Sequence, residues 1–176
     1  MKKILWLAIP AALIAIQLIR PDTTNPPVDP AQDFQQVANP PAEVQTILKS
    51  ACYDCHSNET KHPWYSQIAP VSWWVTDHVN EGREALNFST FGMLSPGDRA
   101  EALEEASENI REGEMPLPSY TWMGMHPEAK LTAAQRDLLT GWLDANGGEG
   151  GGNAESSGGA EKAGKESAEK ETDADD

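Results

Sequence analysis

The sequence predicts an all-α fold of four helices in one small domain, and three observations lead to it. Apolar residues recur at spacings of three and four in four segments between residues 40 and 148. Ser, Thr, Pro and Gly occupy the positions that start and end helices. No segment shows the alternation of apolar and polar residues that is typical of strands.

The first helix is expected in the segment PPAEVQTILKSACYDC, residues 40–55. Pro41 suits the start of a helix, and Glu43 falls in the first turn, where acidic residues are favoured. Helical spacing gives this segment one apolar face, made of Val44, Ile47, Leu48 and Ala51.

The second helix is expected in SWWVTDHVNEGREALNF, residues 72–88, with Ser72 as its N-cap after Pro70. Its apolar side is less regular and consists of Trp74, Val75, His78, Val79 and Leu86.

The third helix should begin at Ser95 or Pro96 and end at Gly113, because glycine commonly follows the last helical turn. The fourth should have Thr132 as N-cap and end after Asn146. Its apolar face is Leu138, Leu139, Trp142 and Leu143. The loops at residues 57–71 and 114–131 are long, aromatic and marked by prolines, which in a small domain is typical of segments that enclose a cofactor.

The two ends of the chain differ from this domain, which we place at residues 42–146. Residues 1–20 have two lysines ahead of an apolar run and predict a signal anchor or a signal peptide. The absence of a good cleavage site favours an uncleaved membrane anchor, although the run is short for a bilayer span. Residues 21–41 are rich in proline and predict a linker, which could wrap around the domain near Phe34.

Residues 147–176 are rich in Gly and Glu, contain almost no apolar side chain, and predict a disordered acidic tail. The tail supplies about six of the formal net charge of −15. Because the domain itself is also acidic, nucleic acid is not an expected partner. A solvated surface explains this charge most simply, and a docking face for a basic redox partner is the alternative.

Both cysteines of the chain lie in the motif Cys52-x-x-Cys55-His56. This spacing is typical of c-type haem attachment, in which two thioether bonds hold the haem and the histidine binds its iron. A zinc site would need further ligands, a thioredoxin-like pair would follow a strand, and a disulfide would close a very small loop. Covalent haem c, one per chain, is therefore the expected cofactor.

Further segments, in order along the chain, resemble the haem-binding domain family of exported bacterial proteins, which is related to monohaem c-type cytochromes. They are ACYDCHSNET (51–60), PWYSQIAPVSWWV (63–75), EGREALNFS (81–89), IREGEMP (110–116), HPEAKLT (126–132) and GWL (141–143). The resemblance spans about Asn25 to Leu143, with His62 in place of an expected aromatic residue. It implies a small cytochrome c-like helical domain wrapped around its haem.

The resemblance also implies residue roles. Met115 in REGEMP resembles the distal ligand loop of cytochrome c, and Pro70 in IAP resembles the position whose carbonyl accepts a hydrogen bond from the proximal histidine. The other candidates for the sixth iron ligand are Met93, Met123, Met125, His62, His78 and His126, and an open or water-bound position is a further alternative.

Aromatic residues in the two long loops and the helices suit the wall of a haem crevice and the contact between the first and last helices: Trp64, Tyr65, Trp73, Trp122 and Trp142. Trp64, Tyr65 or Arg83 could also donate hydrogen bonds to the haem propionates.

Ligation by histidine and methionine predicts an electron-transfer cytochrome, served by unidentified redox partner proteins. The alternatives are a haem-based ligand sensor, a peroxidase-like enzyme with an open distal site, and a structural or assembly module. Because c-type haem is attached outside the bacterial cytoplasm, we expect the domain at the inner membrane facing the periplasm, or free in the periplasm if the signal is cleaved.

Overall fold

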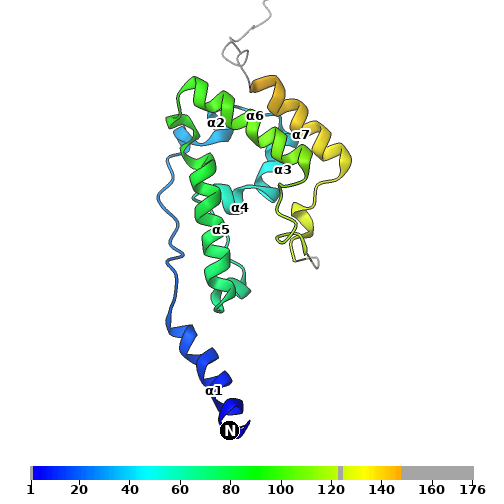
Figure 1. The fold of residues 1–176 in the computed structure, drawn as a ribbon. Helices are drawn as coiled ribbons and strands as arrows, with labels where there is room; N and C mark the ends of the chain where they lie inside the picture. Colours follow the sequence, from blue (N-terminus) through cyan, green and yellow to red (C-terminus); the bar gives the residue numbers. More distant parts are fainter. Residues whose placement is uncertain (1, 123–124, 148–176) are drawn as a thin grey trace, which may run out of the picture.

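The computed structural model of the chain describes residues 2–122 and 125–147 (Figure 1). These residues form helices and short 3-10 turns, and no strand occurs among them, which confirms the all-α prediction. The predicted acidic tail lies outside the described residues, apart from Gly147. Within the described ranges, no helix combines the length and hydropathy that crossing a membrane requires.

The N-terminal segment forms helix α1 (Lys2–Ala15), with Pro10 inside it, and continues as a 3-10 turn, η1 (Ile16–Leu18). It projects from one end of the domain in Figure 1. Two contacts hold its last turn against the domain. The Gln17 side-chain amide donates to the Ala69 carbonyl at 3.0 Å and accepts from the Ala69 N–H at 2.9 Å, and the Trp73 indole N–H donates to the Ile19 carbonyl at 2.8 Å.

The proline-rich segment predicted as a linker contributes directly to the core. It forms the 3-10 turn η2 (Pro30–Gln32) and the short helix α2 (Phe34–Val37). Phe34 is fully buried, with its ring 5.1 Å from that of Phe88 and 4.7 Å from that of Phe91. The Tyr53 hydroxyl donates to the buried Asp33 carboxylate at 3.0 Å. The packed unit thus begins before residue 42, because Phe34 fills space that the main helices leave open.

The helix predicted at residues 40–55 is divided in two. Helix α3 (Ala42–Ala51) buries Val44, Ile47 and Leu48, as its apolar spacing predicts. Cys52 then leaves helical geometry with φ −123° and ψ −38°, and a single further turn, α4 (Tyr53–His56), follows.

Helix α5 (Val71–Ala85) starts one residue before the predicted N-cap, because the Pro70 carbonyl already accepts the N–H groups of Trp73 and Trp74. Ser72 is therefore inside the helix. The buried face of α5 also differs from the predicted one, since it consists of small or medium residues: Ser72, Thr76, Val79 and Gly82. Trp74, expected on the apolar face, is partly exposed.

The capping signals of the last two main helices are confirmed. Helix α6 (Pro96–Glu112) has Ser95 as N-cap and ends at Gly113, which adopts the left-handed φ of 80°. Helix α7 (Ala133–Asn146) starts with a capping box between Thr132 and Gln135. The two helices pack side by side, and the Ser107 hydroxyl donates to Asp144 at 2.7 Å (Figure 1).

Three shorter turns complete the described fold. They are η3 (Trp64–Gln67), η4 (Phe88–Met93) and η6 (Pro127–Ala129). The main core consists of buried residues from α2, α3, α4, η4, α6 and α7. It leaves a space between α3, α6 and the end of α5, beside the cysteine motif.

The backbones of α4 and α5 approach each other closely at Gly82. A Cβ atom on Gly82 would lie 3.0 Å from the Cys55 carbonyl oxygen, whereas one on Gly141 in α7 would meet nothing within 4 Å. We expect Gly82→Ala to destabilise the protein by about 1–2 kcal/mol through overpacking. Gly141→Ala should stabilise it by about 0.5–1 kcal/mol through helix propensity. Urea unfolding of both variants measures this, and a stabilised Gly82→Ala would contradict the close packing.

Candidate functional site

The motif of two cysteines and a histidine lies at the junction of α3 and α4. The Cys52 carbonyl accepts the N–H groups of Cys55 at 3.2 Å and His56 at 2.9 Å, which closes the turn after the break in the helix. Cys52 and His56 both line one apolar cavity, and Cys55 and His56 line a second space beside it. The three residues of the motif therefore face one continuous crevice.

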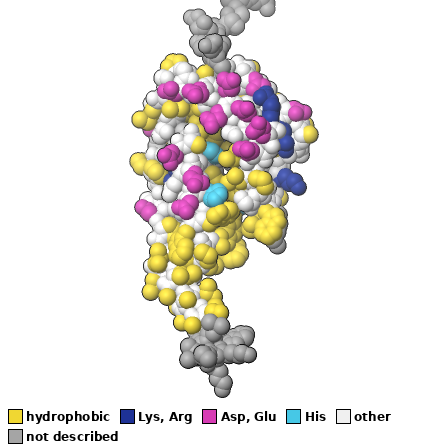
Figure 2. All heavy atoms as spheres, viewed as in Figure 1, with side chains coloured by type: hydrophobic (Ala, Val, Ile, Leu, Met, Phe, Trp, Pro, Cys, Tyr) yellow, Lys and Arg dark blue, Asp and Glu magenta, His cyan; other side chains and the backbone are white. Residues whose placement is uncertain are grey.

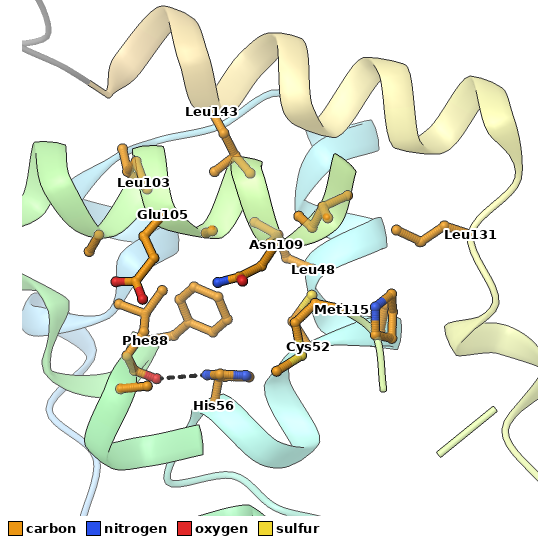
Figure 3. A pocket seen from close by; sticks show the side chains of 17 residues that line it. Leu48, Cys52, His56, Phe88, Leu103, Glu105, Asn109, Met115, Leu131 and Leu143 are labelled. Carbon is orange, nitrogen blue, oxygen red and sulfur yellow. Dashed lines mark hydrogen bonds between the residues drawn. The ribbon is translucent and has the colours of Figure 1, made fainter. Parts of the chain in front are cut away.

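The imidazole of His56 is held by a backbone carbonyl, as a metal-binding histidine requires. Its Nδ1 lies 3.0 Å from the carbonyl oxygen of Leu86, drawn as a dashed line in Figure 3. Because a carbonyl only accepts hydrogen bonds, Nδ1 carries the proton and Nε2 keeps its lone pair. Burial lowers the pKa of His56, with opposing contributions from the backbone carbonyls of Leu86 and Gly82. The ring is thus neutral and oriented.

The acceptor for His56 differs from the one that the sequence suggested. Pro70 is exposed at the start of α5, and its carbonyl bonds to the N–H groups of Trp73 and Trp74. Leu86 follows the end of the same helix, so its carbonyl is free of helical partners and points toward the motif.

The main cavity lies between α3, α6 and the loop that follows α6. Including its open mouth, it has a volume of about 840 Å³. Figure 3 shows Leu48 and Cys52 on one side, Leu103, Glu105 and Asn109 of α6 on another, and Phe88 near the base. The cavity is lined mainly by apolar side chains: Leu48, Ala51, Ala85, Leu86, Phe88, Ala102, Leu103, Ala106, Ile110, Pro116, Leu131 and Leu143.

Met115 lines this cavity and also the neighbouring space, as His56 does. Its thioether could therefore serve as a second ligand to a metal ion bound by His56. The end of α6 sets its position. Gly113 turns the chain in the left-handed conformation, and the Asn109 carbonyl accepts the N–H groups of Glu114 at 2.9 Å and Met115 at 3.1 Å.

The space beside the cavity widens the crevice. It has a volume of about 730 Å³ with its mouth included. Besides the residues that it shares with the main cavity, it is lined by Cys55, His78, Glu81, Gly82, Leu117 and Tyr120. The Tyr120 hydroxyl donates to Asp54 at 3.0 Å, which joins the loop after Met115 to α4. Burial, and then the charge of Asp54, raise the pKa of Tyr120, so its hydroxyl stays protonated.

Three residues predicted to contact the cofactor are not among the residues that line the cavity or the space beside it. Trp64 is 77% exposed and lines neither part of the crevice. The Tyr65 hydroxyl bonds to Nε2 of His126, and Tyr65 lines a neighbouring pocket together with Cys55, His78 and Tyr120. Arg83 donates to the Ser57 carbonyl at 2.8 Å, the Asn25 side chain at 2.7 Å and the Thr60 hydroxyl at 2.9 Å, so its guanidinium fixes the N-terminal segment and the loop after the motif.

Other aromatic residues of the predicted wall are also dispersed. Trp122 is exposed, Trp73 bonds to Ile19, and Trp142 packs on Phe34 with ring centroids 5.8 Å apart. The apolar wall is formed by aliphatic residues and Phe88 instead.

Of the alternative donors, only His78 joins Met115 at the crevice among the residues that the structure describes. Its Nδ1 lies 2.9 Å from the Trp74 carbonyl. Met93 is 74% exposed, Met125 lines a neighbouring pocket that shares Cys55, His78 and Tyr120 with the second space, and His126 is buried against the ring of Tyr120. His62 is half-buried outside the crevice, and Met123 lies outside the described residues.

Sequence reasoning missed Leu86, Asn109 and the bond from Tyr120 to Asp54. Leu86 and Asn109 act through backbone carbonyls, for which the side chain carries no signal. The aromatic, proline-marked character of residues 114–131 did signal a functional loop, and Tyr120 lies in it.

One family model matches this chain. It is described as "Haem-binding domain" and matches residues 11–145. No curated protein and no solved structure gives a significant match.

The thiols of the motif should react slowly in the folded protein prepared without cofactor. Burial, together with the nearby Cys55 thiol, raises the pKa of Cys52 to about 12. Burial, together with Asp54, raises that of Cys55 to about 11. We expect alkylation by iodoacetamide at pH 8 to be at least about 100-fold slower than in urea, where thiols titrate near pH 8.5.

The pH profile separates pKa from access. Because the folded pKa values are raised, the folded-state rate should keep increasing between pH 8 and pH 10, whereas the rate in urea levels off above about pH 9. Mass spectrometry of each cysteine peptide follows both rates. Parallel profiles in the two states would contradict the raised pKa values.

Proposed function

The chain belongs to the haem-binding domain family, and we propose that it carries one covalent haem c and serves as an electron-transfer cytochrome. In this proposal Cys52 and Cys55 form the thioether bonds, His56 is the proximal iron ligand and Met115 is the distal one. The observation that carries it is that Cys52, His56 and Met115 line one apolar cavity. The lone pair on Nε2 of His56 can bind iron there, because Nδ1 carries the proton.

The chemistry of the site fits a haem. The wall is aliphatic apart from Phe88, Glu105 and Asn109, and apolar surroundings of this kind suit a porphyrin. The donors are a neutral imidazole and a thioether, which are ligands that iron accepts in cytochromes. When bound, the haem supplies a one-electron couple between ferric and ferrous iron.

The protein's own contribution is orientation and exclusion of water. The Leu86 carbonyl fixes the imidazole plane, and the Asn109 carbonyl fixes the backbone at Met115. The aliphatic wall restricts solvent, and a low-dielectric environment with methionine and histidine ligands favours a raised potential. Ligands held by the fold in this way keep the reorganisation that accompanies electron transfer small.

Partners and location belong to the same proposal. We place the chain at the bacterial inner membrane with the domain facing the periplasm, served by redox partner proteins. The support is the N-terminal segment, whose Leu7, Ile9, Leu13 and Ile14 side chains are exposed, behind two lysines. Periplasmic haem attachment requires export, which the same segment would direct.

Covalent attachment is tested with the two cysteines. Expressed with a haem-attachment system, the protein should gain the mass of one haem that persists after denaturation. Cys52→Ser and Cys55→Ser should each leave one thioether, and the double variant should lose all covalent haem. Intact-mass spectrometry in denaturant measures this, with Ser50→Ala as a control that changes a neighbouring residue outside the motif. Haem retained by the double variant would exclude the assignment.

Ligation by Met115 is tested through carbon monoxide. We expect the ferrous spectrum of the natural chain to stay unchanged under carbon monoxide, because both axial positions are held. Met115→Ala should convert this into a nearly complete spectral shift, and the exposed Met93→Ala should not. An immediate shift in the natural chain would instead favour a ligand sensor or peroxidase-like enzyme with an open distal site.

A further inference from the structure

The end of the domain from which α1 projects carries a surface of exposed apolar side chains. We call it the Trp-rich end, and its residues are Trp64, Ile68, Val71, Trp74, Trp122 and Met125. Trp64 and Trp122 are 77% and 65% exposed, and Trp74 is 45% exposed. Exposed aromatic residues gathered in this way on a small domain mark an interaction surface rather than ordinary surface variation.

These side chains are close together although they come from two loops and α5. Trp74 and Met125 line the same pocket, together with Tyr65, whose ring is 5.9 Å from that of Trp64. Trp122 lies close to this pocket, because its carbonyl accepts a hydrogen bond from the Met125 N–H at 3.3 Å. Ile68 and Val71 flank the start of α5.

The Trp-rich end is continuous with the apolar surface of the N-terminal segment. The bonds from Gln17 to Ala69 and from Trp73 to Ile19 hold η1 directly beside Ile68 and Val71. Leu18 and Ile19 are exposed at this junction. Figure 2 shows hydrophobic side chains over much of the lower part of the domain and on the segment that projects below it.

Acidic residues are distributed unevenly between the Trp-rich end and the opposite end of the domain. No Asp or Glu occurs in residues 61–76 or 115–127, the segments that form the Trp-rich end, whereas α6 alone holds six. In Figure 2 the acidic side chains gather toward the opposite end. Lys61 and Arg20 adjoin the apolar residues in sequence. An anionic lipid surface would repel the acidic end more strongly than the Trp-rich end, where Asp54 is the one carboxylate among the described residues that line the pocket of Trp74 and Met125.

We propose that the Trp-rich end rests in the interfacial layer of a phospholipid bilayer. Tryptophan is enriched at this depth because its ring is apolar while its N–H remains hydrated. Insertion of α1 and contact by the Trp-rich end then act together and fix how the haem domain stands on the membrane. This inference rests on the proposed membrane attachment and not on the proposed iron ligands.

The test uses the full chain bound to vesicles of phosphatidylcholine and phosphatidylglycerol that contain a phospholipid with a diazirine near its headgroup. After illumination, mass spectrometry locates the cross-linked residues. We expect cross-links on the Trp-rich end at least about tenfold above those on Met93 and Leu138. These two are matched controls, since they are 74% and 41% exposed and lie outside the surface.

A pair of variants sharpens the result. Trp64→Glu combined with Trp74→Glu should lower cross-linking at Ile68 and Val71 by about threefold or more, because charge disfavours this depth, and Met93→Glu should not. Both tryptophans are exposed, so circular dichroism should stay unchanged. The absorbance of the same sample reports haem loading, so a failed haem assignment is visible separately.

Two results would overturn the proposal. One is a chain that does not float with the vesicles. The other is cross-linking confined to residues 4–19, or equal on the Trp-rich end and the two controls; the surface would then belong to a protein partner.

Discussion

The close packing of α4 on α5 is the constraint on which the rest of the site depends. Gly82 allows the backbone at Cys55 to approach α5 closely, because a Cβ atom there would lie only 3.0 Å from the Cys55 carbonyl oxygen. The same approach brings the end of α5 to His56, where the Leu86 carbonyl fixes the ring. A larger residue at position 82 would press on the Cys55 carbonyl, next to the histidine in the sequence.

The break in the helix at Cys52 has a matching role. If α3 continued without a break through residue 56, the histidine would lie on the surface of that same helix and not on a separate turn. The change at Cys52 starts a separate turn, so Tyr53 enters the core while Cys52 and His56 line the cavity. Asp33, from the segment before α3, holds Tyr53 and thereby supports this arrangement.

The sequence predicted the features that depend on local chemistry. Ser95, Gly113 and Thr132 cap their helices as expected because capping is decided within one turn. The motif at residues 52–56 pointed to haem, and the family match agrees with haem binding. The buried face of α5 could not be predicted, since its small residues are buried by close backbone contact and carry little apolar signal.

Long-range contacts account for the remaining differences. Arg83 was expected to donate hydrogen bonds to the haem propionates, and the partners it has in the structure lie 23 to 58 residues away in the sequence. Phe34 was placed in a linker because of the surrounding prolines, although a single large ring can be recruited into a core from an irregular segment. Neither outcome follows from local spacing.

The hydrogen bonds made by Asn25 and Pro27 limit how far the domain can move relative to α1. A free coil of the length of residues 21–41 would have an end-to-end distance of about 25 Å and would let the domain swing through that radius. Here Asn25 bonds to Thr60 and Arg83, and the Pro27 carbonyl accepts from Asn58, so the segment has no such slack. A domain tethered this closely cannot search for distant molecules by swinging. In the proposed membrane-bound electron carrier, electron exchange would then rely on partners that diffuse along the same membrane.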